Sequence, residues 1–376
     1  MRNALDDSAA VEEQSPSRVM APFALGVGSW GTPPGVKLDL RYAPDEAALL
    51  DHDVGAMWEA VVRRSAGAGS ALASHYAVDD PYGGVRGAPV VSRFFNVGLS
   101  AEQVTFGAGV TSLLHALSGL ADHGVVMSPV LTHPDLDTWS ATRGGRVVPL
   151  EGPPLRDQLS LALARVRPTL LHFDRPDFLG QMLDLDELEH LLAVAERAGT
   201  IVLIDESAAQ YLGPSGSAGR LVNRVGNLIV LRGFTKAYSL GGMRAAYAVA
   251  SRELASTVRT LVPPLQVSEL SLAVALELLR AGDMFAHVRA RVCAVKPIAR
   301  QVLQDAMLSV IATREELPWL GVRDTEQRTS AFLEQRGVFA LRPPATGRQP
   351  SAGTDVLRLT IPLSDDRIAL FSQLLA

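Results

Sequence analysis

The sequence has one cysteine, three lysines and no apolar core near its N-terminus of the kind that signal peptides have. The single Cys293 excludes a disulfide within the chain. Without a signal-like segment, we expect the protein in the reducing cytoplasm. A formal net charge of −5 provides no general basic surface, so the sequence predicts neither nucleic acid nor a membrane as a partner. We also expect no metal site.

The length and composition predict a large folded protein with two domains. The chain has 376 residues, of which 47% are hydrophobic, and this is enough to bury a sizeable core. We expect a mobile N-terminal arm at 1–36, because its first residues are polar and acidic with Ser-Pro pieces. A large domain is predicted at 37–262, with 37–46 packing on the other domain, and a small domain at 263–376.

Apolar segments alternate with segments of helical periodicity through the large domain. This alternation predicts an α/β fold of three layers, with a mainly parallel sheet between helices and a smaller α+β C-terminal domain. Expected strands are 125–127, 146–150, 169–173, 201–204, 228–231, 339–342 and 357–361. Expected helices are 110–122, 184–198, 269–281 and 284–308.

Two polar residues follow neighbouring apolar strands. Lys236 comes just after 228–231, and Asp205 directly follows 201–204. Open α/β sheets gather their chemistry at the carboxyl ends of such strands. A lysine that can form a Schiff base and a carboxylate that can keep a pyridinium nitrogen protonated are what pyridoxal phosphate needs from a protein.

These segments resemble the fold-type I pyridoxal-phosphate enzymes. Asp205-Glu206, Thr235-Lys236 and Arg244 are similar to the class I/II aminotransferases of the histidinol-phosphate aminotransferase kind. The resemblance extends from about Lys37 to the C-terminus. It includes a tyrosine-containing segment, a phosphate loop and a carboxylate-binding strand, at Tyr76–Asp79, Gly107–Ser112 and Val356–Thr360.

The resemblance implies roles for the first two residues. Lys236 would hold pyridoxal 5′-phosphate as a Schiff base and shuttle a proton during the reaction, and Asp205 would face the ring nitrogen. The alternatives are an exposed lysine on a turn and an aspartate that caps a helix.

Phosphate binding is predicted for the glycine loop and its surroundings. Glycines allow close approach of the backbone, and amides at a helix start attract anions. An NAD site is the competing interpretation, but Ser112 stands at the third glycine position and no acidic residue ends the next strand. Tyr76, by resemblance, would reach the phosphate of a neighbouring subunit in a homodimer, and its alternative is a buried tyrosine with a local partner. The residues predicted to bind phosphate are Gly109, Val110, Thr111, Ser112, Thr235, Arg244 and Tyr76.

Other positions concern the substrate and the cofactor ring. Arg358 matches the family arginine that binds the substrate carboxylate, although an arginine on an edge strand is the alternative. Arg41 and Tyr42 replace the usual residues near the mouth of the site and predict a different side-chain pocket. His133 is the predicted stacking residue, with Trp139 as its alternative.

Two departures from the family concern the reaction. Asp177 and Ala208 stand where the family has an asparagine and a tyrosine that contact the cofactor's O3′. A carboxylate there would disfavour a nearby phenolate unless it were protonated.

Three functions are therefore considered. We expect an aminotransferase for an amino acid or amine of specialised metabolism. The second hypothesis is another pyridoxal-phosphate reaction, namely decarboxylation, elimination or replacement, cyclisation or oxidation. The third is a non-catalytic descendant, against which the presence of Lys236, Asp205, Arg244 and Arg358 together argues.

Overall fold

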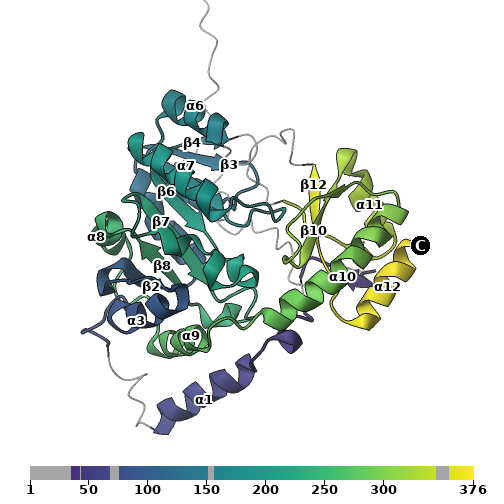
Figure 1. Cartoon of the computed structure of the whole chain (residues 1–376), viewed down its shortest axis with the longest axis horizontal. Coiled ribbons are helices and arrows are strands. Elements are labelled where there is room, and N and C mark those ends of the chain that lie inside the picture. Colours follow the sequence, from purple (N-terminus) through teal and green to yellow (C-terminus); the bar gives the residue numbers. More distant parts are fainter. Residues whose placement is uncertain (1–34, 43, 68–75, 151–155, 344–354) are drawn as a thin grey trace, which may run out of the picture.

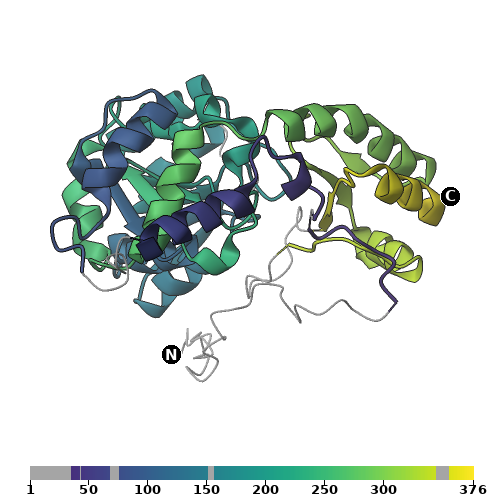
Figure 2. The same cartoon turned by 90° about the horizontal axis from the view of Figure 1, so that it is seen from below.

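The computed structural model describes residues 35–42, 44–67, 76–150, 156–343 and 355–376. The predicted N-terminal arm therefore lies almost wholly outside the described residues. Figure 1 shows a large domain that contains the main sheet, with a smaller domain beside it. The same two lobes are seen from below in Figure 2.

A seven-stranded sheet forms the centre of the large domain. Its strand order is β2-β8-β7-β6-β5-β3-β4, and only β8 runs antiparallel to its neighbours. The mainly parallel sheet predicted from the sequence is confirmed. The strands are β2 (Val104–Gly107), β3 (Val125–Pro129), β4 (Arg146–Leu150), β5 (Leu170–Asp174), β6 (Ile201–Asp205), β7 (Leu228–Gly233) and β8 (Ala246–Ala250).

Helices cover both faces of this sheet, because its central strands are apolar on both sides. One face packs against leucines and valines of three helices, α4 (Val110–Leu117), α5 (Asp135–Thr142) and α8 (Arg252–Leu261). The opposite face is covered by α3 (Gly84–Phe95), α6 (Arg156–Val166), α7 (Leu185–Arg197) and α9 (Glu269–Ala281). The result is the predicted three-layer arrangement.

Helix ends follow local chemistry. Asp184 and Glu187 form a reciprocal capping box at the start of α7, and Gly199, at φ +70°, follows its end. The helix expected at 110–122 is shorter than predicted, because α4 gives way to the 3-10 helix Ser118–Ala121.

The small domain combines a sheet and three helices. Its strands have the order β12-β10-β9 and are antiparallel. They are β9 (Val310–Ile311), β10 (Trp319–Arg323) and β12 (Val356–Thr360), with α10 (Ala286–Asp305), α11 (Arg328–Gln335) and α12 (Asp365–Leu375) beside them.

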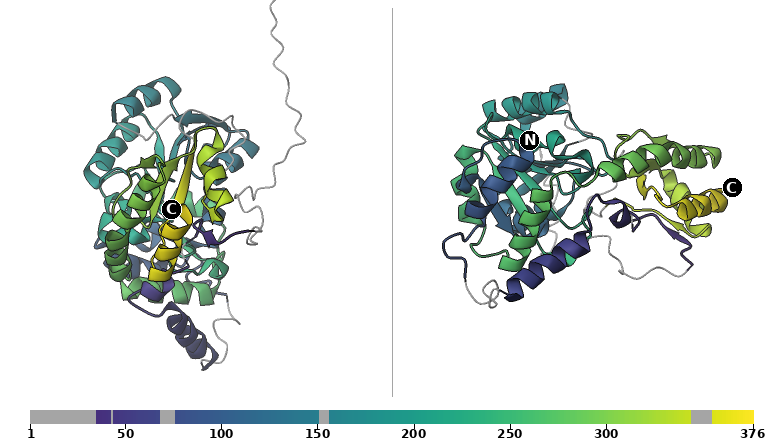
Figure 3. Two further views of the ribbon diagram at one scale, coloured as in Figure 1. Left: turned by 90° about the vertical axis from the view of Figure 1, so that its right-hand side faces the viewer. Right: turned by 60° about the horizontal axis from the view of Figure 1, so that its bottom comes forward.

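An N-terminal segment joins the two domains. Strand β1 (Leu38–Asp39) pairs in parallel with β11 (Val338–Phe339) of the small domain. Helix α1 (Val54–Gly67) then packs along α9 of the large domain, as Figure 3 shows. Since α9 contacts α1 and α3 whereas α10 contacts α12, we propose a domain boundary between α9 and α10, later than the one expected near residue 262.

A buried ion network joins the ends of three central strands. The Glu206 carboxylate accepts hydrogen bonds from Arg175 Nη1 at 2.8 Å and from Arg232 Nη1 at 3.1 Å. The hydroxyl of Ser217 and the amide of Ala218 also donate to it. All three charged side chains are at most 3% exposed, so removal of the carboxylate would leave two buried cations without compensation.

We expect Glu206→Ala to lower the free energy of unfolding by about 3–5 kcal/mol, because it leaves Arg175 and Arg232 as unpaired buried charges. Urea denaturation of the purified variant measures this change. The matched control is Glu189→Ala, whose partner Arg224 is 62% exposed. This surface pair should cost less than about 1 kcal/mol. Equal losses in the two variants would contradict the structural role of Glu206.

Candidate active site

The structure brings Lys236 and Asp205 to the same edge of the sheet. Asp205 is the last residue of β6 and is only 5% exposed, and Lys236 lies in the turn after β7. Ser207 stands between them. Its hydroxyl accepts a hydrogen bond from Lys236 Nζ at 3.0 Å, and its amide donates to Asp205 Oδ1 at 2.7 Å.

The glycine loop between β2 and α4 lies against Arg244. Gly109 has φ +93°, and a Cβ there would lie 2.3 Å from Arg244 Nη2. Arg244 Nη2 donates to the Ala108 carbonyl at 3.2 Å. A Cβ at Gly233, the last residue of β7, would lie 2.9 Å from Val110 Cγ2, so the loop adjoins the strand that leads to Lys236. Amides at the start of α4 and the guanidinium of Arg244 are groups that suit an anion, and they lie side by side here.

His133 belongs to the same cluster. Burial lowers its pKa, Lys236 lowers it further, and the carboxylates of Asp135 and Asp205 oppose the change. Its amide donates to Asp174 Oδ2 at 2.9 Å. The alternative residue, Trp139, instead packs edge-on against His115 with ring centres 4.6 Å apart. Of the two candidate rings, His133 is therefore the one whose pKa is affected by Lys236, and Trp139 packs elsewhere.

Two carboxyl groups of the β5 end face this cluster. Burial raises the pKa of Asp177 to about 6, although the amides of Gln181 and Leu179 bind its carboxylate. Asp174 is paired in register with Asp205, and burial together with that neighbour raises its pKa well above the ordinary value. Sequence analysis missed Asp174, although it ends an apolar strand just as Asp205 does.

Arg358 reaches this cluster from the small domain. It lies on β12, with its Cζ 5.0 Å from the Phe178 ring centre and 5.1 Å from that of Trp319. Burial lowers its pKa, and the nearby carboxylates of Asp174 and Asp177 oppose that change. The guanidinium is held between two aromatic rings and carries its charge beside the β5 end.

The remaining predicted residues are placed less centrally. Arg41 forms a two-point ion pair with Asp39, with bonds of 3.0 and 2.7 Å, and its Cζ lies 5.5 Å from the Tyr42 ring centre. Thr235 is exposed, and Thr111 and Ser112 are half-buried at the start of α4. Tyr76 is 81% exposed, which excludes the alternative of a buried tyrosine within one chain.

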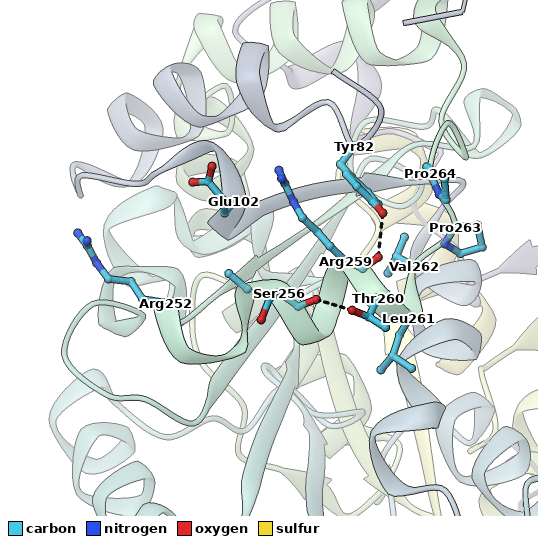
Figure 4. A pocket seen from close by; sticks show the side chains of 11 residues that line it. Tyr82, Glu102, Arg252, Ser256, Arg259, Thr260, Leu261, Val262, Pro263 and Pro264 are labelled. Carbon is cyan, nitrogen blue, oxygen red and sulfur yellow. Dashed lines mark hydrogen bonds between the residues drawn. The ribbon is translucent and has the colours of Figure 1, made fainter. Parts of the chain in front are cut away.

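A cavity of about 670 Å³ lies elsewhere on the large domain, as Figure 4 shows. Its lining includes Tyr82, Arg259 and Pro264, and Tyr82 Oη donates to the Arg259 carbonyl at 2.9 Å. None of the predicted cofactor residues lines it, and we place the chemistry at Lys236, where an amine, carboxylates and an anion cradle meet.

Among the described residues, no helix combines the length and apolar character needed to cross a bilayer.

The chain belongs to the aminotransferase class I and II family, whose pattern it matches over residues 90–370. An aromatic amino acid aminotransferase of Cutibacterium acnes is 26% identical over 271 residues, which cover 69% of this chain and 75% of that enzyme. The matches to the aromatic amino acid aminotransferases of Mycobacterium marinum and Mycobacterium ulcerans each cover 45% of those enzymes.

Solved structures share the fold. The histidinol-phosphate aminotransferase of Sinorhizobium meliloti, in complex with pyridoxal-5′-phosphate, has a TM-score of 0.70 at 17% identity and covers 96% of both chains. An L-threonine-O-3-phosphate decarboxylase from Porphyromonas gingivalis has a TM-score of 0.69 at 14% identity, and the match covers 90% of this chain and 98% of that one. Because both reactions occur on this fold, the fold alone does not select between them.

The protein is a pyridoxal-phosphate-dependent enzyme, and its residues fit that cofactor. Gly109 has no Cβ, and a Cβ there would collide with Arg244. The space between this backbone and the guanidinium suits a phosphate group. Asp205 is nearly buried, as suits a partner of a ring nitrogen, and Lys236 offers an amine at the same edge. When bound, pyridoxal phosphate supplies an aldehyde carbon that condenses with amines and a pyridine ring that withdraws electrons.

We expect Gly109→Ala to weaken pyridoxal-phosphate binding at least about tenfold, because its methyl group would displace Arg244 from the phosphate cradle. Titration of the apoenzyme with the cofactor measures the dissociation constant. The control is Gly199→Ala, which also changes a glycine at positive φ but has open space around it. The control should lose some stability and keep its affinity. Unchanged affinity in Gly109→Ala would show that the cradle does not bind the phosphate.

Asp177→Asn should stabilise the apoenzyme at neutral pH. The pKa of Asp177 is raised to about 6, so between about pH 4 and 6 the folded chain keeps a proton that the unfolded chain has lost. The native free energy of unfolding therefore falls as the pH rises through this window. Relative to the native enzyme, the variant should gain about 1–2 kcal/mol between pH 4.5 and 7.

Urea denaturation at both pH values tests this expectation. Asp355→Asn is the control, since Asp355 is exposed, and its stability difference from the native enzyme should be the same at the two pH values. A difference for Asp177→Asn that does not depend on pH would contradict the burial argument.

Proposed function

We propose that this enzyme is an aminotransferase that moves the amino group of an amino acid or amine to a keto acid in specialised metabolism, in the cytoplasm. The observation that carries the proposal is the placement of Lys236 Nζ beside Ser207 and Asp205, at the edge that Arg358 faces from the small domain. An amine, a ring-nitrogen partner and a carboxylate receptor then surround one space. These are the groups that amino-group transfer requires.

Each residue near the cofactor has a proposed task. Lys236 would hold the cofactor through its amine and would be the base that moves a proton to or from the α-carbon of the substrate. Asp205 keeps the ring nitrogen protonated through a carboxylate that is nearly excluded from water. His133 would stack on the ring, and Asp177 would contact the ring's O3′. The phosphate would be held by the amides of Gly109, Val110, Thr111 and Ser112, by the Thr235 hydroxyl and by Arg244.

Arg358 binds the carboxylate of the substrate in this proposal. The rings of Phe178 and Trp319 fix its guanidinium plane, which suits a two-point contact with a carboxylate. Arg41 and Tyr42 are proposed to limit the side-chain pocket. The ion pair of Arg41 with Asp39 neutralises the charge of Arg41, which favours an uncharged substrate side chain near it.

A homodimer is proposed from an exposed apolar patch. Four apolar or aromatic side chains near one another in the fold are 39% to 81% exposed, namely Tyr76, Val78, Val85 and Leu265. Their segments are joined by the hydrogen bond from the Leu265 amide to the Pro81 carbonyl at 2.7 Å. Arg86 anchors the first segment by binding Asp80 and Glu269. Such a rigid exposed patch suits an interface through which Tyr76 reaches the partner's phosphate.

A different reaction at the same lysine is the second candidate function. Asp177 and Ala208 replace the usual O3′ contacts, and burial raises the pKa of both Asp177 and Asp174. A carboxyl group whose pKa is raised toward neutral pH can pass a proton to or from a substrate, as a decarboxylation or elimination needs.

The test is the visible absorption spectrum of the enzyme loaded with pyridoxal phosphate. Amino acids are added one at a time, and a keto acid is then added to each sample. Transamination predicts that the correct amino acid removes the visible band and that the keto acid restores it. Steady turnover that never removes the band would support the second function, and no band with added cofactor would overturn both.

Lys236→Ala should abolish turnover, a loss of at least about 10⁴-fold, because no other lysine among the described residues stands at the end of β7 to bind the cofactor and move the proton. Steady-state assays measure the loss, and circular dichroism checks that the fold is intact. Lys37→Ala is the matched control, since Lys37 is an exposed lysine beside β1 and should leave turnover unchanged. Activity retained in Lys236→Ala would end the proposed mechanism.

A further inference from the structure

Ser207 makes a contact that the proposed roles leave unexplained. Lys236 Nζ donates to Ser207 Oγ at 3.0 Å, and this is the one side-chain hydrogen bond of the Lys236 amine among the described residues. The next residue, Ala208, has no hydroxyl, and the side chain of Asp205 points a carboxylate oxygen at the Ser207 amide. Ser207 is thus the residue of this turn whose hydroxyl binds the Lys236 amine.

The backbone that carries Ser207 is held on several sides. The Asp205 carbonyl accepts from the Arg175 amide at 2.8 Å, and the Glu206 amide donates to the Leu231 carbonyl at 2.9 Å. The Glu206 side chain is fixed in the buried ion network with Arg175 and Arg232. The Ser207 hydroxyl is therefore presented by a rigid turn, whereas Lys236 is an exposed side chain with a flexible four-carbon stem.

Other groups around Lys236 act on its charge without fixing its position. The carboxylate of Asp174 attracts the ammonium group, and Lys236 lowers the pKa of the neighbouring His133. Neither Asp174 nor His133 forms a hydrogen bond with Nζ among the described contacts. A flexible amine in such a field can adopt several positions, and one directional acceptor selects among them.

We propose that Ser207 is a positioning residue, whose hydroxyl holds the Lys236 amine where it meets the aldehyde of the incoming cofactor and, later, the α-carbon of the substrate. This inference rests on the proposed function of Lys236. Ser207 acts through the lysine, and its amide bond to Asp205 is independent of the hydroxyl. Loss of the hydroxyl therefore leaves the partner of the ring nitrogen in place.

The experiment separates binding of the cofactor from its reaction with the amine. Apoenzyme is mixed with pyridoxal phosphate, and the rate at which the visible band appears is measured. Equilibrium binding of pyridoxine 5′-phosphate, which has the phosphate and ring but no aldehyde, is measured by calorimetry. Ser207→Ala should slow band formation about tenfold, as expected for one lost hydrogen bond to a charged amine. Its affinity for pyridoxine 5′-phosphate should stay within about twofold of native.

Two further variants sharpen the result. Ser207→Thr keeps a hydroxyl and should restore most of the rate. Ser239→Ala removes an exposed hydroxyl from the turn after β7 that carries Lys236, and it should behave as the native enzyme. In steady-state assays, Ser207→Ala should lower kcat and leave KM nearly unchanged, because substrate binding uses Arg358.

Three outcomes would overturn the inference. A native rate of band formation in Ser207→Ala removes the positioning role, and a parallel loss of rate and of pyridoxine 5′-phosphate affinity assigns Ser207 to the binding cradle instead. A native apoenzyme that forms no band with pyridoxal phosphate overturns the proposed function itself, and the inference with it. The first two results leave the native band intact, so the failures are distinguishable.

Discussion

The buried carboxylate of Glu206 is the constraint on which the rest of the site depends. It binds Arg175, after β5, and Arg232, near the end of β7, so three neighbouring strands end at one level. The residues on either side of it are Asp205, whose carboxylate accepts from the Ser207 amide, and Ser207, whose hydroxyl accepts from Lys236. A charged group excluded from water thus orients two polar groups at the water-facing edge of the sheet.

The electrostatics of the site follow from unequal burial. Burial raises the pKa values of both Asp174 and Asp177, and the neighbouring carboxylates of Asp205 and Asp177 raise that of Asp174 further. Lys236 and Arg358 supply the opposing charge from two different domains. Any movement of the small domain changes the distance of Arg358 from these carboxyl groups and therefore couples domain position to their ionisation.

The fold was largely predictable, because its buried parallel strands are short apolar runs flanked by helices of clear periodicity. Strand β8 was not predicted, since its alanines are weak strand formers and it enters the sheet antiparallel through pairing with β2 and β7. The domain boundary that we propose rests on contacts and not on a sequence pattern. Helix α10 follows α9 in the chain, and the contacts of α9 with α1 and α3 support its assignment to the large domain.

The sequence by itself determined the family, the cofactor and three candidate groups, namely the amine of Lys236, the carboxylate of Asp205 and the bare backbone of Gly109. These depend only on which residue stands next to the end of a strand or helix. Only the tertiary structure decided which groups meet. Ser207 reaches Lys236 across 29 positions of the chain, and Arg358 lies beside Asp174 from another domain. Such contacts are set by strand order and domain packing, which no local pattern encodes, so the neighbours of each reactive group could not be read from the sequence alone.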